Sequence, residues 1–346
     1  MVQLRGAMSA EVLSTHTPAL LAAAVARAAT QLQAGEVVGV PTETVYGLAA
    51  NAFNPEAVAQ IFKLKGRPAH NPIIVHVASA TMARACSSQW PALADVLGAA
   101  FWPGPLTLVV PKSAAIPAPV TAGGDTVGVR WPQHPFMQAV IRACGFPLAA
   151  PSANLANRLS PTNARHVMAQ LGEVLSLIVD GGDCNVGIES TVVDVTGSVP
   201  VILRPGMISE PAIRAAVAGF TADPGCPREA RGPVLRSPGQ LARHYSPKAR
   251  LVIGNWSDES DLARQVAQLG FSPNEVCVLA HTCIPLSGQF PQVMLIPDDA
   301  EAFARALYAE LHRCDEAKVP LIVVEALPET PEWAGIADRL RRAATP

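Results

Sequence analysis

The sequence predicts two α/β domains, a larger N-terminal domain with a mixed sheet and a smaller C-terminal domain with a parallel sheet. The chain has 346 residues, more than one typical domain, and 49% of them are apolar, which is enough for a sizeable core. Short apolar runs typical of buried strands are interleaved with capped helical segments. Between residues 222 and 249, proline, glycine and arginine dominate and the periodicity disappears, which indicates a linker between the domains.

Helix starts in the first domain, residues 17–221, are marked by capping side chains. Thr17, Asn54 and Ser160 are each followed by a proline, which combines an N-cap with proline at the first helical position. Strands and helices mix here without strict alternation, and this favours a twisted mixed sheet over a doubly wound one. The predicted helices cover about 18–32, 55–63, 79–87, 91–100, 135–144, 161–171 and 210–218, and the predicted strands cover 37–40, 72–77, 106–110, 126–130, 147–150, 175–179, 191–195 and 199–203.

The second domain, residues 250–346, shows strands that alternate with helices. We predict strands at 251–254, 276–280, 293–296 and 321–324, with helices at 258–269 and about 299–314. This alternation is typical of a small parallel, Rossmann-like sheet. The segment has no GxGxxG sequence, so we do not expect a dinucleotide there.

Composition restricts the class of protein. The net charge is −2, so no global field attracts the chain to nucleic acid, and any basic site must be local. The seven cysteines include no CxxC pair, which argues against a disulfide framework and against a zinc site. We therefore expect reduced thiols and a cytoplasmic location.

The start of the chain carries no targeting signal that we recognise. Residues 1–16 lack the apolar core of a signal peptide, and we expect a loosely ordered lead-in. The apolar run from Ala19 to Ala29 contains Arg27 and is too short to span a bilayer, so we expect no membrane contact.

The stretch from Pro41 to Leu48 is the one around which the first domain is organised. It follows a predicted buried strand and holds two threonines, a glutamate and a tyrosine before Gly47. Open α/β sheets place ligands at the carboxyl ends of their strands. From spacing alone, a simple strand-to-loop connection with capping hydroxyls explains the same residues.

Further polar and basic clusters follow along the first domain. They are Lys63-Leu64-Lys65-Gly66-Arg67, Ser152-Ala153-Asn154, Ser160-Pro161-Thr162, Ser190-Thr191-Val192-Val193-Asp194 and Arg204-Pro205-Gly206. Two of only five lysines lie in the first of these clusters. There is no Walker A sequence, no kinase glycine loop and no Ser-His-Asp or Cys-His constellation, so we expect no covalent enzyme intermediate.

These motifs, in this order, resemble the YrdC-type threonylcarbamoyl-AMP synthase family over residues 17–219. The linker motif between Ser237 and Pro247 and the second domain resemble the long, two-domain form of that family. The resemblance implies a YrdC-like domain with a concave, partly basic face. It also implies a reaction in which L-threonine and bicarbonate give N-carboxy-threonine, whose carbamate oxygen attacks the α-phosphate of ATP. Pyrophosphate leaves, and the threonylcarbamoyl-AMP serves the N6-threonylcarbamoyladenosine modification of tRNA.

The resemblance also implies roles for individual residues. Catalytic roles fall to Lys63, Lys65 and Arg67. ATP contacts fall to Arg67, Asn71, Thr126, Ser152, Asn154, Ser160, Arg204, His244 and Tyr245, and L-threonine contacts to Thr44, His76, Arg130, Ala150 and Ser190. Lysine and arginine suit a triphosphate because charge builds on phosphoryl oxygens during displacement. A lone histidine such as His76 at the end of an apolar strand is more often a core residue, and here the family pattern reverses that interpretation.

Mg²⁺ is expected to enter on the phosphates of ATP, with no metal site built from protein ligands alone. Glu43 and Asp194 are candidates for an outer shell around the substrates. Expected partners are the small-molecule substrates, a downstream threonylcarbamoyl-transferase complex and, at most, weakly held tRNA.

The linker, 222–249, is predicted to act as a lid over the active site. Arg243, His244 and Tyr245 lie between two prolines and offer a cation, a titratable ring and a phenol to a nucleotide. Proline lowers the conformational cost of ordering such a segment. We expect His244 and Tyr245 to point inward while the second domain anchors the far end. A passive tether is the alternative.

Two other functions compete with the synthase. One is an RNA-binding module without catalysis, which the near-neutral charge and the lack of aromatic stacking platforms disfavour. The other is a carbamoyl-transfer enzyme that uses carbamoyl phosphate. The resemblance implies zinc-finger segments in such chains, and the absence of CxxC pairs disfavours it.

Overall fold

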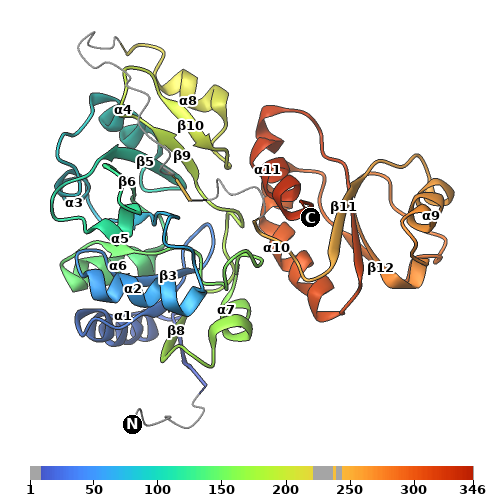
Figure 1. The fold of residues 1–346 in the computed structure, drawn as a ribbon, viewed down its shortest axis with the longest axis horizontal. Helices are drawn as coiled ribbons and strands as arrows, with labels where there is room; N and C mark the ends of the chain where they lie inside the picture. Colours follow the sequence, from blue (N-terminus) through green and yellow to red (C-terminus); the bar gives the residue numbers. More distant parts are fainter. Residues whose placement is uncertain (1–8, 221–236, 239–243, 346) are drawn as a thin grey trace.

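A computed structural model of the chain describes residues 9–220, 237–238 and 244–345, which form two sheets with helices packed on them (Figure 1). No helix in these residues is both long and apolar enough to cross a membrane. The strands are β1 (Glu11–Ser14), β2 (Val38–Val40), β3 (Gly47–Asn51), β4 (Val75–His76), β5 (Leu106–Pro111), β6 (Thr126–Arg130), β7 (Leu148–Ala149), β8 (Leu177–Asp180), β9 (Thr191–Asp194), β10 (Val201–Arg204), β11 (Arg250–Gly254), β12 (Val276–Ala280), β13 (Gln292–Leu295) and β14 (Leu321–Glu325).

The helices follow the predicted order and add four that were not predicted from the sequence, α5, α11 and the short η1 and η2. They are α1 (Pro18–Gln33), α2 (Pro55–Lys65), α3 (Ala80–Ala85), α4 (Ala92–Phe101), α5 (Ala118–Thr121), α6 (Pro135–Cys144), α7 (Ala164–Leu171), α8 (Glu210–Ala216), α9 (Glu259–Gln268), η1 (Pro273–Glu275), α10 (Ala300–Glu316), η2 (Pro331–Trp333) and α11 (Ala334–Ala343).

The first domain has one large sheet with the strand order β1-β8-β2-β3-β7-β4-β6-β5-β9-β10. The sheet contains both parallel and antiparallel pairs: β4 pairs with β6 in parallel and with β7 antiparallel, and β5 pairs with β6 antiparallel and with β9 in parallel. The prediction of a mixed sheet is confirmed. Many strands that are adjacent in the sheet are far apart in the sequence, and this brings the predicted motifs to the same part of the sheet.

Two of the three predicted helix caps are confirmed. The side chain of Thr17 accepts a hydrogen bond from Leu20 N, and that of Asn54 accepts from Glu56 N and Ala57 N. The prediction for Ser160 is wrong, because α7 begins at Ala164 and its N-cap is Asn163. The Ser160 hydroxyl donates instead to the carboxylate of Glu189, which is a stronger acceptor than a neutral oxygen.

The expected loosely ordered lead-in is wrong for residues 9–16, and residues 1–8 lie outside the described part. Residues 11–14 form β1, which pairs in parallel with β8 from Glu11 opposite Leu177 to Ser14 opposite Asp180. The edge of β8 offers unpaired backbone groups, and β1 satisfies them. Backbone pairing across a large sequence separation leaves little trace in the local sequence.

The second domain holds a four-stranded parallel sheet, as predicted, and its strand order is β11-β14-β12-β13. In Figure 1 its helices α10 and α11 lie on the side that faces the first domain, and α9 lies on the far side. Helix α11 was not expected from the sequence.

The two domains share a hydrophobic cluster. Val45, Leu159 and Ile188 of the first domain pack with Tyr245 of the linker and with buried side chains of α10 and α11. Two glycines allow the backbones to come close at this interface. A Cβ on Gly187, at φ +85°, would lie 2.3 Å from the carbonyl oxygen of Ala304, and a Cβ on Gly335 would lie 2.8 Å from the backbone of Gly206. The second domain is therefore packed directly behind the motif residues.

Candidate active site

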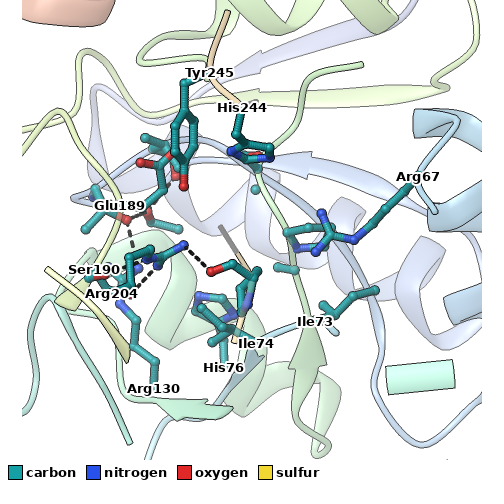
Figure 2. Close-up of a pocket in the computed structure, with 18 residues that line it drawn as sticks. Arg67, Ile73, Ile74, His76, Arg130, Glu189, Ser190, Arg204, His244 and Tyr245 are labelled. Carbon is teal, nitrogen blue, oxygen red and sulfur yellow. Dashed lines mark hydrogen bonds between the residues drawn. The ribbon is translucent and has the colours of Figure 1, made fainter. Parts of the chain in front are cut away.

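A cavity of about 50 Å³ lies where the motifs converge (Figure 2). Its walls come from seven segments of the first domain and from the linker. The lining residues are Thr42, Thr44, Val45, Gly47, Arg67, Ile73, Ile74, His76, Arg130, Ala150, Pro151, Ser152, Glu189, Ser190, Arg204, Pro238, His244 and Tyr245. The structure thus brings together ten of the sixteen predicted site residues.

Strand register places the cationic side chains. His76 ends β4 and lies opposite Arg130 at the end of β6 in the parallel pair. Arg130 in turn lies opposite Thr107 of β5. Arg204 ends β10, opposite Val192 of β9, and Ser190 comes just before that strand. Three strands, β4, β6 and β10, therefore end at one place, next to the start of β9. The carboxyl ends of strands are where an α/β sheet presents ligand-binding side chains.

Arg130, which lines the cavity, is held by an ion pair. Its Nη2 lies 2.7 Å from Oε1 of Glu43, and its Nη1 donates to the Thr44 hydroxyl at 2.7 Å. Burial alone would raise the pKa of Glu43, but Arg130 and a hydrogen bond from Gln133 N keep it below the ordinary value. Glu43 is therefore an anion that orients Arg130, and this makes it a more specific contributor than the outer-shell role we expected.

His76 is neutral in this setting. Its side chain is buried, and burial together with the neighbouring Arg130 lowers its pKa to about 3. Its Nδ1 has no hydrogen-bond partner among the described residues. A buried polar atom without a partner is costly, so this nitrogen is suited to a polar group of a ligand.

Arg67 follows the C-terminal end of α2, where Gly66 adopts a left-handed conformation at φ +60° and turns the chain. Its Nε donates to Asn71 O at 3.1 Å and its Nη2 to Pro72 O at 2.7 Å. Burial lowers its pKa to about 10, so it stays cationic at neutral pH. Its two carbonyl contacts orient the guanidinium without neutralising it.

Arg204 is bound to Ser190 on the opposite wall. Its Nε donates to Ser190 O and its Nη2 to Ser190 Oγ, both at 3.1 Å, and its Nη1 lies 3.4 Å from Pro238 O. The Ser190 hydroxyl also shares a 2.7 Å hydrogen bond with the Thr107 hydroxyl. Ser190, placed at the threonine end by resemblance, is thus coupled directly to a residue placed at the ATP end.

Glu189 is a site residue that the sequence analysis missed. It lines the cavity, and its carboxylate accepts from Ser160 Oγ at 2.5 Å and from Arg339 Nε at 2.8 Å. Burial would raise its pKa, but Arg339 and Arg204 hold it below the ordinary value. The available signal was a single carboxylate between Ile188 and a serine at the start of an apolar run.

Six predicted site residues do not line the cavity: Lys63, Lys65, Asn71, Thr126, Asn154 and Ser160. Lys63 is exposed on α2, and Thr126 begins β6 whereas Arg130 ends it, about 13 Å away at 3.3 Å per residue. Ser160 is buried behind Glu189. Asn71 is buried, and its carbonyl oxygen accepts a hydrogen bond from Arg67, which lines the cavity.

Lys65 and Asn154 form a support beneath the cavity wall. Nζ of Lys65 donates to Ser152 O and Asn154 O, both at 2.5 Å, and to Asn154 Oδ1 at 3.1 Å. Burial lowers the pKa of Lys65, while three oxygen acceptors favour the ammonium form. Its three protons hold the 152–154 turn, which carries Ser152 into the cavity.

The linker supplies one side of the cavity. His244 and Tyr245 are both buried, with ring centroids 3.9 Å apart in an edge-on arrangement. Figure 2 shows their rings on the side opposite His76 and Arg130, with Arg67 and Arg204 between. Arg243 lies outside the described residues. The inward direction expected for the two rings agrees with this view.

Residues 9–220, 237–238 and 244–345 contain no group of three or more His, Cys, Asp or Glu side chains that could hold a metal ion. Glu189, the carboxylate that lines the cavity, is already bound by Ser160, Tyr308 and Arg339. The donor set therefore does not fit an all-protein magnesium site.

Comparison with known proteins gives matches to both domains. Residues 30–206 match the Sua5/YciO/YrdC family, described as "Telomere recombination", and residues 208–345 match "Threonylcarbamoyl-AMP synthase, C-terminal domain". The threonylcarbamoyl-AMP synthase of Bacillus subtilis is 40% identical over 341 residues, covering 96% of this chain and 94% of the relative. The synthase of Pyrococcus abyssi is 37% identical over 327 residues, covering 90% and 92%.

Solved structures of the Pyrococcus abyssi protein Sua5 have the same two-domain fold. Its complex with L-threonine matches with a TM-score of 0.85 and 33% identity, covering 97% of this chain and 98% of that one. A variant of that protein, in which two consecutive residues, a histidine and a tyrosine, are replaced by alanine, also matches with a TM-score of 0.85 and 34% identity. The match covers 97% of this chain and 96% of that one.

The lowered pKa of His76 predicts a loss of stability in weak acid. The unfolded chain takes up this proton below about pH 6.5, whereas the folded chain does so only near pH 3, so the free energy of unfolding falls as the pH falls between these values. His166 and His244, whose pKa values are also lowered to about 3, add to the effect. Urea unfolding between pH 7.5 and 4.5 should show it.

The variant His76→Gln should flatten this dependence by up to about 1.4 kcal/mol per pH unit, because one titrating group is removed. Substitution of the exposed His16 by Gln is the matched control and should leave the slope unchanged. An identical slope in His76→Gln and the parent would show that His76 titrates normally in the folded state.

Proposed function

The chain belongs to the threonylcarbamoyl-AMP synthase family, in its two-domain form, and we propose that its cavity converts L-threonine, bicarbonate and ATP to threonylcarbamoyl-AMP and pyrophosphate. The observation that carries this is the set of three guanidinium groups, Arg67, Arg130 and Arg204, around one cavity with serine and threonine hydroxyls between them. Among the described residues, Arg130 has a carboxylate partner in an ion pair, whereas Arg67 and Arg204 have none. Two unneutralised cations suit a polyphosphate.

The threonine end of the cavity is assigned to Thr44, His76, Arg130, Ala150 and Ser190. Arg130 offers its guanidinium to the substrate carboxylate, and the buried Nδ1 of neutral His76 offers a hydrogen bond. The threonine hydroxyl needs a polar partner, because a site built to hydrogen-bond a substrate hydroxyl strongly rejects analogues that lack it. Ala150 contributes shape, since its side chain is a single methyl group.

The ATP end is assigned to Arg67, Ser152, Arg204, His244 and Tyr245, which all line the cavity. Supporting roles go to the predicted residues that lie behind these walls. Lys65 and Asn154 hold the Ser152 turn, Asn71 orients Arg67, and Ser160 orients Glu189. Lys63 and Thr126 lie further away, and their assignment rests on the family resemblance alone.

Catalysis in this site is a matter of positioning and charge stabilisation. The threonine nitrogen forms a bond to the bicarbonate carbon with loss of water, which gives the carbamate. A carbamate oxygen then attacks the α-phosphorus of ATP, and the bond to the β-phosphate oxygen breaks to release pyrophosphate. Arg67 and Arg204 stabilise the charge on the phosphoryl oxygens, and neither step needs an enzyme nucleophile.

Mg²⁺ would be held mainly by the phosphates of ATP, since the described residues provide no carboxylate cage for it, and it would supply neutralisation of phosphate charge. The product is a labile mixed anhydride, so it needs an acceptor soon after release. A threonylcarbamoyl-transferase complex acting on tRNA is that acceptor. The protein works in the cytoplasm, and tRNA binds it weakly at most, as the net charge of −2 favours.

The linker acts as a lid over the nucleotide. A cavity of about 50 Å³ is far smaller than the roughly 300–1,000 Å³ typical of ligand pockets, so lining residues must move to admit ATP. Pro238, His244 and Tyr245 are the lining residues that come from the linker and not from the first domain. Their return over bound substrates excludes water and protects the anhydride.

Pyrophosphate release is the direct test of the activity. The purified protein with ATP, L-threonine, bicarbonate and Mg²⁺ should release pyrophosphate and form an AMP adduct detectable by mass spectrometry. Omission of threonine or of bicarbonate should abolish both signals. Release that persists without threonine contradicts the assignment, and turnover with carbamoyl phosphate in place of bicarbonate would favour the carbamoyl-transfer alternative.

Arg67→Ala should lower kcat/KM for ATP at least about tenfold, because a charged hydrogen bond to phosphate contributes more than about 1.5 kcal/mol. Arg67→Lys keeps the charge but not the forked geometry, and its kcat/KM should lie between that of the parent and that of Arg67→Ala. Arg142→Ala, an exposed arginine on α6, is the matched control. A folded Arg67→Ala protein with parental kinetics would remove Arg67 from the ATP site.

The lid predicts ligand protection of the linker. Trypsin cleavage within 222–249, followed by mass spectrometry, should slow when ATP and L-threonine are present together. The combined substitution of His244 and Tyr245 by alanine removes both rings and should abolish this protection. Equal cleavage rates with and without both ligands in the parent protein would leave the segment as a tether.

A further inference from the structure

Arg339 is a fully buried arginine that the second domain contributes to the wall of the first. It lies on α11, and its side chain has 0% exposure. Its Nε donates to the Glu189 carboxylate at 2.8 Å and its Nη2 to the carbonyl oxygen of the same residue at 3.0 Å. Its Nη1 donates to Pro205 O at 2.8 Å. One guanidinium therefore joins two segments of the first domain.

Each of those two segments carries a substrate-binding residue at the next position. Glu189 precedes Ser190, and Pro205 follows Arg204. Ser190 and Arg204 are bound to each other through the backbone and the hydroxyl of Ser190. Arg339 therefore holds the residues adjacent to Ser190 and Arg204, the pair that links the threonine and ATP ends of the cavity.

The same guanidinium supports the linker. It lies 5.3 Å from the centroid of the Tyr245 ring, within range for a cation–π contact. Tyr245 has φ +59°, a left-handed conformation that a bulky residue rarely adopts and that its surroundings must maintain. Tyr308 of α10, 6.1 Å from Tyr245 between ring centroids, packs on the same ring.

Tyr308 is the second contact of the C-terminal domain with this carboxylate. Its hydroxyl donates to Glu189 Oε2 at 3.2 Å, and Ser160 donates to the other oxygen. Glu189 is thus held by residues of both domains and has no freedom to rotate. A buried carboxylate with this many donors is rigid, and the residues attached to it are placed accurately.

We propose that Arg339 is a positioning residue of the substrate site, which it holds through Glu189, Pro205 and Tyr245, so that the C-terminal domain completes the active site. This rests on the proposed synthase activity. Arg339 is not one of the residues that line the cavity, so it acts on the substrates through its three neighbours. The proposal gives the second domain a role beyond anchoring the linker.

The forked geometry separates positioning from simple packing. Lysine keeps the charge and much of the apolar stem but cannot reach the carboxylate, the two carbonyl oxygens and the ring at once. Arg339→Lys should therefore fold while it lowers kcat/KM for both threonine and ATP at least about tenfold, mostly through higher KM values. Tyr308→Phe removes one hydroxyl donor and should cause a smaller loss of the same kind.

Chemical rescue provides a measurement that would not change if Arg339 had only a structural role. Arg339→Ala leaves a buried space next to the Glu189 carboxylate, and millimolar methylguanidinium should restore part of its pyrophosphate release. Methylammonium at the same concentration is the control cation, because it lacks the fork. Arg341→Ala, on the exposed face of the same helix, is the matched protein control and should behave as the parent.

The outcomes are separable from a failure of the synthase assignment. A parent protein without threonine-dependent pyrophosphate release overturns the proposed function before Arg339 is tested. With an active parent, Arg339→Lys and Tyr308→Phe proteins that melt earlier but keep parental KM values for both substrates overturn the positioning role. If Arg339→Ala does not fold, these two milder variants decide the question.

Discussion

The buried ion pair between Arg339 and Glu189 is the interaction on which the arrangement of the site depends. An uncompensated carboxylate in this position would be costly, and a carboxylate bound by three donors is both stable and rigid. Because the arginine comes from the last helix of the chain, the first domain cannot present Glu189 in this way by itself. Gly187 and Gly335 allow the approach, since neither position has room for a side chain.

The distribution of charge within the cavity also depends on which buried charges have a partner of opposite charge. Glu43, which lies behind the cavity wall, neutralises Arg130 and orients its guanidinium at one end. Arg67 and Arg204 are oriented by carbonyl and hydroxyl oxygens and keep their full charge. Neutral His76 adds a hydrogen-bonding atom without another cation. The cavity is thus graded from a balanced end to a strongly positive end.

The linker lies where these two features meet. Tyr245 packs in the hydrophobic cluster shared by both domains, next to Arg339, while it also lines the cavity with His244. A segment in this position responds both to what fills the cavity and to how the domains pack. The second domain therefore serves the chemistry of the first through the linker and through Glu189 at the same time.

The sequence by itself determined the two-domain α/β organisation, the mixed and parallel sheets, the caps at Thr17 and Asn54, and ten of the residues that line the cavity. The organisation, the sheets and the caps follow from local signals, namely short apolar runs and capping side chains, whereas the ten lining residues follow from the family resemblance that the ordered motifs carry. Only the tertiary structure decided that β1 joins the large sheet, that Ser160 binds Glu189 instead of capping a helix, and that Lys65 supports the Ser152 turn from behind. It also decided that Arg339 enters the first domain, although Arg339 lies three residues after the buried Ile336 on the face of α11 that faces the core. In each case the partner is many residues away, and whether a buried polar group is stable depends on what the fold brings next to it.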